Sequence, residues 1–259
     1  MASPEPIPQE VVLEAITELI ELGTAELPMS LEPFTPRFKV ASAGLLARIL
    51  TLGESIVHLS ETRRSMDLFI LVRALYEHLV MLAWISAPRD DSRLDIWFRE
   101  DNRQRLKLDA DIRAYGHAGF SEEDRAFFAR QVEEIGGPGL PPLVQLAEQA
   151  DLDWREYLKP GSATANSLRG SYAIVYRFGS TAAHPTLSAL NTVTDQINAH
   201  NVVRLELKTD VGWVLPLCVS FLGIALMISS VILGRPDRDA AEAITFRFGR
   251  EFVRRHSEG

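Results

Sequence analysis

The stretch LFILVRALYEHLVMLAWI, residues 68–85, is apolar on most of its circumference when it is drawn as an α-helix. A helix of this kind is usually buried at the centre of a helical bundle. Arg73 and Glu77 interrupt the apolar surface, and their spacing of four residues makes them neighbours on one face. Because an unpaired buried charge is costly, we expect both side chains to have partners. They form either a buried ion pair that fixes the helix register or part of a larger polar cluster.

A second apolar run, VGWVLPLCVSFLGIALMISSVIL at residues 211–233, contains no charged residue and is long enough to span a bilayer. Pro216 and several serines interrupt it, and inspection finds no second segment of this kind. A central helix of a bundle would have the same composition, and residues 68–85 already predict one apolar helix. The sequence therefore favours a buried core helix at 211–233, with a membrane span as the alternative.

Further helices are predicted wherever apolar residues recur at helical spacing. They cover residues 9–22, 38–60, 66–86, 90–115, 121–135 and 143–158, the stretch that follows an N-cap at Asn166, and residues 237–255. The helix at 90–115 should carry Leu94, Trp97, Phe98 and Leu108 on its inward side. Loops rich in proline or glycine are expected at residues 24–37 and 136–142.

These patterns together predict an all-α fold, a single-domain helical bundle of about eight to ten helices. Residues 1–37 form an N-terminal helix and a proline-rich loop, and residues 38–259 form the bundle domain. A small irregular or β-hairpin insertion is expected after Pro185, where the sequence VVRLEL alternates. The core should be built from the helices at 66–86, 171–190 and 211–233.

Composition and charge limit the classes of function. With 46% hydrophobic and 24% charged residues, the 259-residue chain has the composition of a folded soluble protein. Its formal net charge of -8 argues against a whole-domain basic surface for duplex DNA. Cys218 is the single cysteine, so we expect neither a disulfide framework nor a cysteine-based zinc site, and a reducing, cytoplasmic location fits. The acidic, proline-rich N-terminus is unlike a secretory signal.

The candidate site lies in SYAIVYRFGSTAAHPTLSAL, residues 171–190, where polar side chains recur at helical spacing and Pro185 ends the run. On an ideal helix of about 3.6 residues per turn, Arg177 and His184 project from nearly the same face. Ser180 falls between them, one turn from each. An arginine, a hydroxyl and an imidazole aligned in an otherwise apolar helix form the best candidate for a site in this sequence.

Two short motifs carry a resemblance to a known family. The first is Arg-x-x-x-Glu at Arg73 and Glu77, and the second is Tyr-x-x-x-Ser-x-x-x-His at Tyr176, Ser180 and His184. With these motifs, residues from about 38 to 233 resemble an uncharacterised bacterial helical family, domain-of-unknown-function family 5677. The resemblance implies an all-α fold in which these five residues match recurring polar positions. The family brings no established activity.

A second resemblance concerns chemistry. Arg177, six residues and then His184 are similar to the Arg-x(4–6)-His motif of HEPN-type helical ribonucleases of toxins and phage-defence systems. That resemblance implies RNA cleavage without metal at a dimer interface. His184 would carry a proton, because a histidine pKa of ~6.5 allows both protonation states near neutrality, and Arg177 would bind the phosphate. In the alternative, His184 is a structural residue that caps the end of its helix.

We therefore predict a HEPN-like, metal-independent ribonuclease of a bacterial stress or defence system, a cytoplasmic homodimer that acts on single-stranded RNA without a cofactor. Arg177 and His184 would be catalytic, and the supporting polar cluster would consist of Arg73, Glu77, Tyr176 and Ser180. The first alternative is a non-catalytic helical module that binds a partner protein or a small ligand through the same cluster. The second is a membrane-anchored helical protein.

Neither metal chemistry nor nucleotide-dependent transfer is expected from the motifs. Glu54 and His58 are four residues apart, whereas di-iron bundles use Glu-x-x-His together with further carboxylates. The sequence has neither a phosphate-binding glycine loop nor a nucleophile elbow.

Overall fold

The computed structural model describes residues 7–26, 34–61, 65–155, 167–176, 179–180 and 214–257, and all regular elements within these ranges are helical. In chain order they are α1 (Gln9–Thr24), α2 (Pro36–Glu61), α3 (Ser65–Ser86), α4 (Ser92–Ala114), α5 (Glu122–Ile135), α6 (Leu143–Asp153), α7 (Leu168–Ser171), the π-helix η1 (Tyr172–Tyr176), α10 (Leu215–Leu233) and α11 (Arg238–Ser257). The predicted all-α fold is confirmed. The insertion predicted after Pro185 lies outside the described residues.

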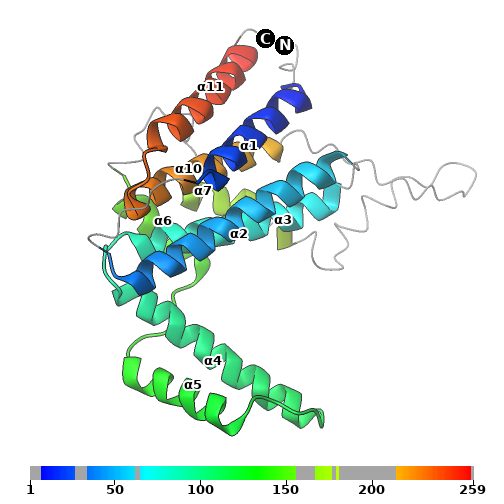
Figure 1. Ribbon diagram of the computed structural model, residues 1–259. Coiled ribbons are helices and arrows are strands. Elements are labelled where there is room, and N and C mark those ends of the chain that lie inside the picture. Colours follow the sequence, from blue (N-terminus) through cyan, green and yellow to red (C-terminus); the bar gives the residue numbers. More distant parts are fainter. Residues whose placement is uncertain are drawn as a thin grey trace, which may run out of the picture.

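Helix α10 is the centre of the bundle. It contacts α1, α2, α3 and α11, which surround it in Figure 1, and it buries 16 of its 19 residues. A helix that is apolar on every side has to be covered on every side, and this requirement explains the arrangement. The prediction that α3 and α10 form the core is confirmed, but α1 and α2 also contribute fully buried side chains, such as Ile16 and Ile49.

Three described helices are long and apolar enough to cross a membrane, by length and composition alone. They correspond to residues 36–60, 67–86 and 215–233, so the expectation of only one such segment is wrong. Within the bundle, 83% of the apolar window of α10 is buried, compared with 61% in α3 and 44% in α2. In this fold α10 is a core helix, and the cytoplasmic location remains a prediction.

Small residues let the helices approach α10 closely. A Cβ atom on Gly223 would overlap Oγ1 of Thr245 in α11 and would lie 3.2 Å from the Cβ of Thr245. A Cβ atom on Gly23, near the end of α1, would lie only 2.6 Å from a methyl carbon of Leu50. These contacts place α11 and α1 against the core at distances that a larger side chain would prevent.

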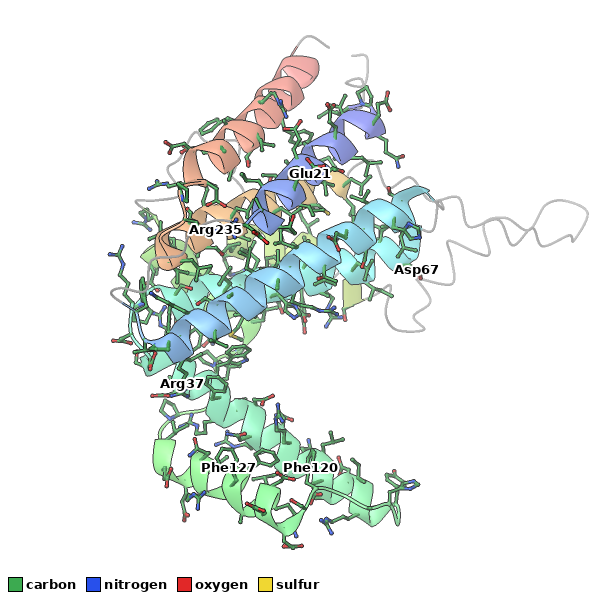
Figure 2. The ribbon with its side chains drawn as sticks, viewed as in Figure 1. Glu21, Arg37, Asp67, Phe120, Phe127 and Arg235 are labelled. Atoms are coloured by element: carbon green, nitrogen blue, oxygen red, sulfur yellow. The ribbon has the colours of Figure 1, made fainter. Side chains whose placement is uncertain are left out.

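Arg235 joins the end of α1 to the turn between α10 and α11. Its Nη1 and Nη2 donate hydrogen bonds of 3.0 Å each to the carbonyl oxygens of Gly23 and Leu22, and it forms a 2.8 Å ion pair with Asp237. Figure 2 shows Arg235 beside the C-terminal part of α1, which also carries Glu21. The guanidinium thus satisfies carbonyl groups that have no partner within α1.

Helices α4 and α5 form an antiparallel hairpin, here called the arm, that projects from the rest of the bundle (Figure 1). Arg37 of α2 lies at its base, where it pairs with Asp95 at 2.6 Å and covers the ring of Phe98 at 4.5 Å (Figure 2). The predicted inward position of Leu108 is wrong, because this side chain is 52% exposed. Beyond its first turns α4 leaves the bundle and packs on α5, so a different face becomes the buried one.

The far half of the arm is held together by Asp109, which is 2% exposed. Its carboxylate accepts a 2.9 Å hydrogen bond from Nε of Arg113 and a hydrogen bond from the backbone amide of Phe120, and it pairs with Arg125 of α5 at 3.0 Å. Desolvation alone would raise the pKa of Asp109, but these hydrogen bonds and the two positive charges outweigh it and hold the pKa below its usual value.

We expect Asp109→Asn to loosen the arm, because the neutral amide loses both ion pairs. Hydrogen exchange should accelerate between residues 105 and 128, while α10 keeps its protection. The pKa of Asp109 is lowered in the folded state, so its contribution to the free energy of unfolding is complete above the unfolded-state pKa of about 3.9. This contribution is lost as the pH falls through the folded-state pKa. Asp101→Asn, which removes an exposed pair with Arg105, is the matched control. Equal exchange in both variants would contradict this role.

We expect Gly223→Ala to destabilise the bundle, because the added methyl group overlaps Thr245. Overpacking costs about 1–3 kcal/mol, and the helix propensity of alanine returns about 1 kcal/mol, so the free energy of unfolding should fall by up to about 2 kcal/mol. Chemical denaturation measures this change. The second substitution Thr245→Ala should restore part of the loss, and Gly44→Ala, where an added Cβ meets nothing, is the control.

Candidate functional site

The candidate site begins at α7, whose start is fixed between α3 and α6. The N-cap is Ser167 rather than the predicted Asn166, and its hydroxyl accepts a 2.7 Å hydrogen bond from the amide of Gly170. From α6, the carboxylate of Asp151 accepts the amides of Leu168 and Arg169 at 2.8 and 2.9 Å. An acidic group at a helix start satisfies free N–H groups and complements the helix dipole.

Helix α3 holds the same turn from the other side. The hydroxyl of Tyr76 donates a 2.6 Å hydrogen bond to the carbonyl oxygen of Leu168. Burial raises the pKa of Tyr76 well above its usual range, and the nearby charge of Asp151 adds to that effect. The hydroxyl therefore keeps its proton and acts as a donor at every physiological pH.

The next turn, Tyr172–Tyr176, is a π-helix rather than the predicted α-helix. The α-helical geometry predicted for this stretch therefore does not hold from Tyr172 to Tyr176, directly before Arg177. A π-helical turn is a rare backbone geometry that is frequently found at functional sites. Its presence directly before the predicted catalytic arginine is consistent with a site at this position.

Arg73 of α3 and the tyrosines of η1 form a continuous stack. The guanidinium carbon of Arg73 lies 4.4 Å from the ring centroid of Tyr176, and Tyr176 stacks on Tyr172 at 4.8 Å with an interplanar angle of 12°. Arg169 follows at 6.0 Å from the ring of Tyr172. We call these four residues the Arg73 stack. Each ring is attracted to the cation beside it, which fixes η1 on the surface of α3.

Nε of Arg73 also donates a 2.8 Å hydrogen bond to Oε1 of Glu77, one turn away on the same helix. The side chains are 21% and 37% exposed, respectively. Of the two alternatives for this pair, burial in the core is therefore wrong, because the two charges lie at the edge of the bundle, where solvent reaches them. Tyr176 and Ser180 are half-buried as well.

Gly179 lies directly against α3. A Cβ atom at Gly179 would lie 2.6 Å from the Cβ of Arg73 and 3.0 Å from the carbonyl oxygen of Phe69. Gly179 is not among the predicted site residues. The available signal was a glycine inside a helical pattern, which often marks a close approach to another backbone. Tyr176 and Gly179 therefore both contact Arg73.

The structure thus brings together three of the predicted site residues, Arg73, Glu77 and Tyr176. Ser180 follows Gly179 directly and lies near this group through its position in the chain. Arg177 and His184 lie outside the described residues, so their meeting with the cluster remains a prediction.

The described residues also bear on two other kinds of site, a metal centre and a cysteine nucleophile. Among the described residues, no three side chains of histidine, cysteine, aspartate or glutamate gather in a group that could hold a metal ion. Cys218 is buried in α10, and burial raises the pKa of its thiol to about 12. The thiol therefore stays protonated near neutral pH and is a poor nucleophile.

The model of a family of unknown function, DUF5677, matches residues 39–200. This range includes α3, the arm and η1, and it contains every predicted site residue. Searches of curated proteins and of solved structures find no match.

We expect Arg73 and Tyr176 to be energetically coupled. In a double-mutant cycle with Arg73→Met and Tyr176→Leu, the coupling free energy should be about 0.5–1 kcal/mol, as for a partly exposed cation–π pair. Urea denaturation of the four proteins measures it. Arg105 and Phe128 of the arm, 5.5 Å apart, provide a weaker reference pair. Additive effects of the two substitutions would show that the Arg73 stack does not hold η1.

Proposed function

Because the chain belongs to the family of unknown function DUF5677, whose activity is not established, we propose the activity from its own residues: a HEPN-like, metal-independent endoribonuclease of a bacterial stress or defence system. Arg177 and His184 are its catalytic residues. Arg73, Glu77, Tyr176 and Ser180 form the supporting polar cluster. The protein acts on single-stranded RNA as a cytoplasmic homodimer.

One observation carries this proposal: a polar cluster that reaches solvent adjoins the segment with the catalytic motif. Tyr176 precedes Arg177 directly, Gly179 follows two residues later, and both contact Arg73. The chain on either side of Arg177 is therefore attached to one point on α3. A partly exposed cluster is accessible to a substrate, whereas an ion pair enclosed in the core would not be.

The chemistry requires a phosphate-binding cation and a proton carrier. Arg177 binds the scissile phosphate and stabilises the charge that develops on its oxygens. The 2′-hydroxyl of the RNA attacks phosphorus, the bond to the 5′-oxygen breaks, and a 2′,3′-cyclic phosphate and a 5′-hydroxyl are formed. His184 carries the proton in one of the two transfers, away from the 2′-oxygen or onto the leaving 5′-oxygen, and water completes the other.

Glu77 has a positioning role in this scheme. Arg73 holds one carboxylate oxygen of Glu77 at 2.8 Å, so the carboxylate has a fixed orientation. Its other oxygen is the acceptor that we assign to the imidazole of His184. Such a contact selects the ring tautomer and raises the basicity of the opposite nitrogen.

A non-catalytic binding module is the second candidate, and a different observation favours it. The Arg73 side chain already has a carboxylate partner and an aromatic partner within the fold. A cluster whose members satisfy each other can serve as a rigid docking surface for a partner protein or a small ligand without any chemistry. Activity measurements on Arg177 and His184 variants separate the two functions.

We expect the wild-type protein to cleave labelled single-stranded RNA in the presence of EDTA and to leave 2′,3′-cyclic phosphate ends. Arg177→Ala and His184→Ala should each lose about 100-fold or more in rate, because each removes one catalytic contribution. Gel analysis of the RNA gives the rates, and circular dichroism with thermal melting establishes that the variants fold.

Two matched substitutions control for the loss of a cation or an imidazole elsewhere. Arg105 and His117 are exposed on the arm, and Arg105→Ala and His117→Ala should cleave at the wild-type rate. If the folded wild type gives no cleavage above that of His184→Ala across unstructured RNAs of varied sequence, the ribonuclease function is wrong. A large fall in the melting temperature of His184→Ala would then identify a structural cluster and support the binding module.

A further inference from the structure

We propose that Arg99 is the anchor of a binding site for a phosphate group, located between α4 and the loop of residues 136–142. Arg99 is 1% exposed, and none of its three guanidinium nitrogens has a hydrogen-bond partner within the described structure. A buried cation without an acceptor is strongly unfavourable. The arrangement is explained if the guanidinium is completed by an anionic ligand.

The other arginines of α4 show what Arg99 lacks. Each of the four has a carboxylate partner within 2.9 Å: these are Arg93 with Asp153, Arg103 with Glu100, Arg105 with Asp101, and Arg113 with Asp109. One turn before Arg99, Asp95 is the carboxylate that could have paired with it locally, but Asp95 is held by Arg37 at 2.6 Å. The most deeply buried arginine of the helix is therefore the one that has no acceptor.

The glycine-rich loop of residues 136–142 lies against the guanidinium of Arg99. A Cβ atom on Gly137 would lie 3.3 Å from Nη1 of Arg99, and residues 136–139 are all exposed. Gly136 and Gly137 have φ angles of 56° and 84°, which side chains other than glycine rarely adopt. This loop connects the arm to α6 (Figure 1). A small outward movement of the loop would open the guanidinium to solvent.

The chemistry of the surroundings selects a phosphate group as the ligand. The planar guanidinium fork matches two oxygens of a phosphate, and burial strengthens the interaction. Arg103 reaches the same loop, because a Cβ atom on Gly139 would lie 3.8 Å from its Nη1, although this nitrogen is paired with Glu100 at 2.8 Å. Glycines also let backbone N–H groups approach an anion closely. The ligand is either free phosphate or a small phosphomonoester, and the arms of the experiment distinguish these sources.

The site is on the arm side of the bundle and involves neither Arg177 nor His184, so its test is independent of the ribonuclease proposal. Thermal melting of the wild-type protein is compared in inorganic phosphate, glycerol phosphate, acetate and chloride at equal ionic strength. We expect a rise that grows with the logarithm of the phosphate concentration and reaches about 5 °C near 100 times the Kd. A larger rise with glycerol phosphate at equal concentration identifies the monoester as the ligand. Hydrogen exchange should slow in residues 136–142 and around Arg99.

Arg99→Met keeps an unbranched side chain but removes the charge. This variant should melt in chloride at or above the wild-type temperature, because the unpaired cation is gone, and should lose the response to phosphate. Arg99→Lys keeps the charge without the fork and should show at least a tenfold weaker Kd. Arg105→Met, an exposed position on the same helix, is the control and should respond as the wild type does.

Two results would overturn the site. The first is a wild-type melting temperature that is the same in phosphate, glycerol phosphate and chloride. The second is a rise that Arg99→Met retains, which would mean that phosphate acts elsewhere or through ionic strength. If Arg99→Met does not fold, hydrogen exchange of the wild-type protein decides the question, because protection outside residues 99–142 contradicts a site at Arg99.

Discussion

The burial of α10 is the constraint on which the rest of the structure depends. This helix is apolar on every side, so it can be stable only if other helices cover its whole circumference. Four helices do so, and each of them presents an apolar face to α10. Glycine at positions such as 223 allows the close approach. The amphipathic helices α1, α2 and α11 have their inward faces set by this requirement, and α3 connects the core to the candidate site.

Charged groups near the core are tolerated in three ways in this protein. Arg235 satisfies the free carbonyl groups at the end of α1 and pairs with Asp237. Arg73 lies at the edge of the bundle, where it pairs with Glu77 and lies over the ring of Tyr176. Arg99 has no such partner. The first two arrangements explain how the fold is held, whereas the third indicates a group from outside the chain.

The candidate site owes its geometry to contacts from two helices that are distant in sequence. Asp151 of α6 and Tyr76 of α3 both hold the start of the short helix α7 through hydrogen bonds to Leu168. The following π-helical turn then places its tyrosines against Arg73. A less favourable backbone turn persists because these side-chain contacts fix it on both sides. Strong local constraint beside a solvent-reaching polar cluster is the arrangement that both proposed functions require.

The sequence by itself determined the all-α class, the buried helices α3 and α10, and the proximity of Arg73 to Glu77, because apolar periodicity and short spacings are local properties of the chain. Most of the arm was also predictable, including the helix at residues 121–135 that corresponds to α5. Only the tertiary structure decided that Leu108 is exposed, that Tyr176 stacks on Arg73, and that Arg99 is covered by a glycine loop. Periodicity indicates which face of a helix is apolar, but the partner that packs on a given residue depends on long-range contacts. The environment of a charged side chain is therefore fixed only when the helices assemble.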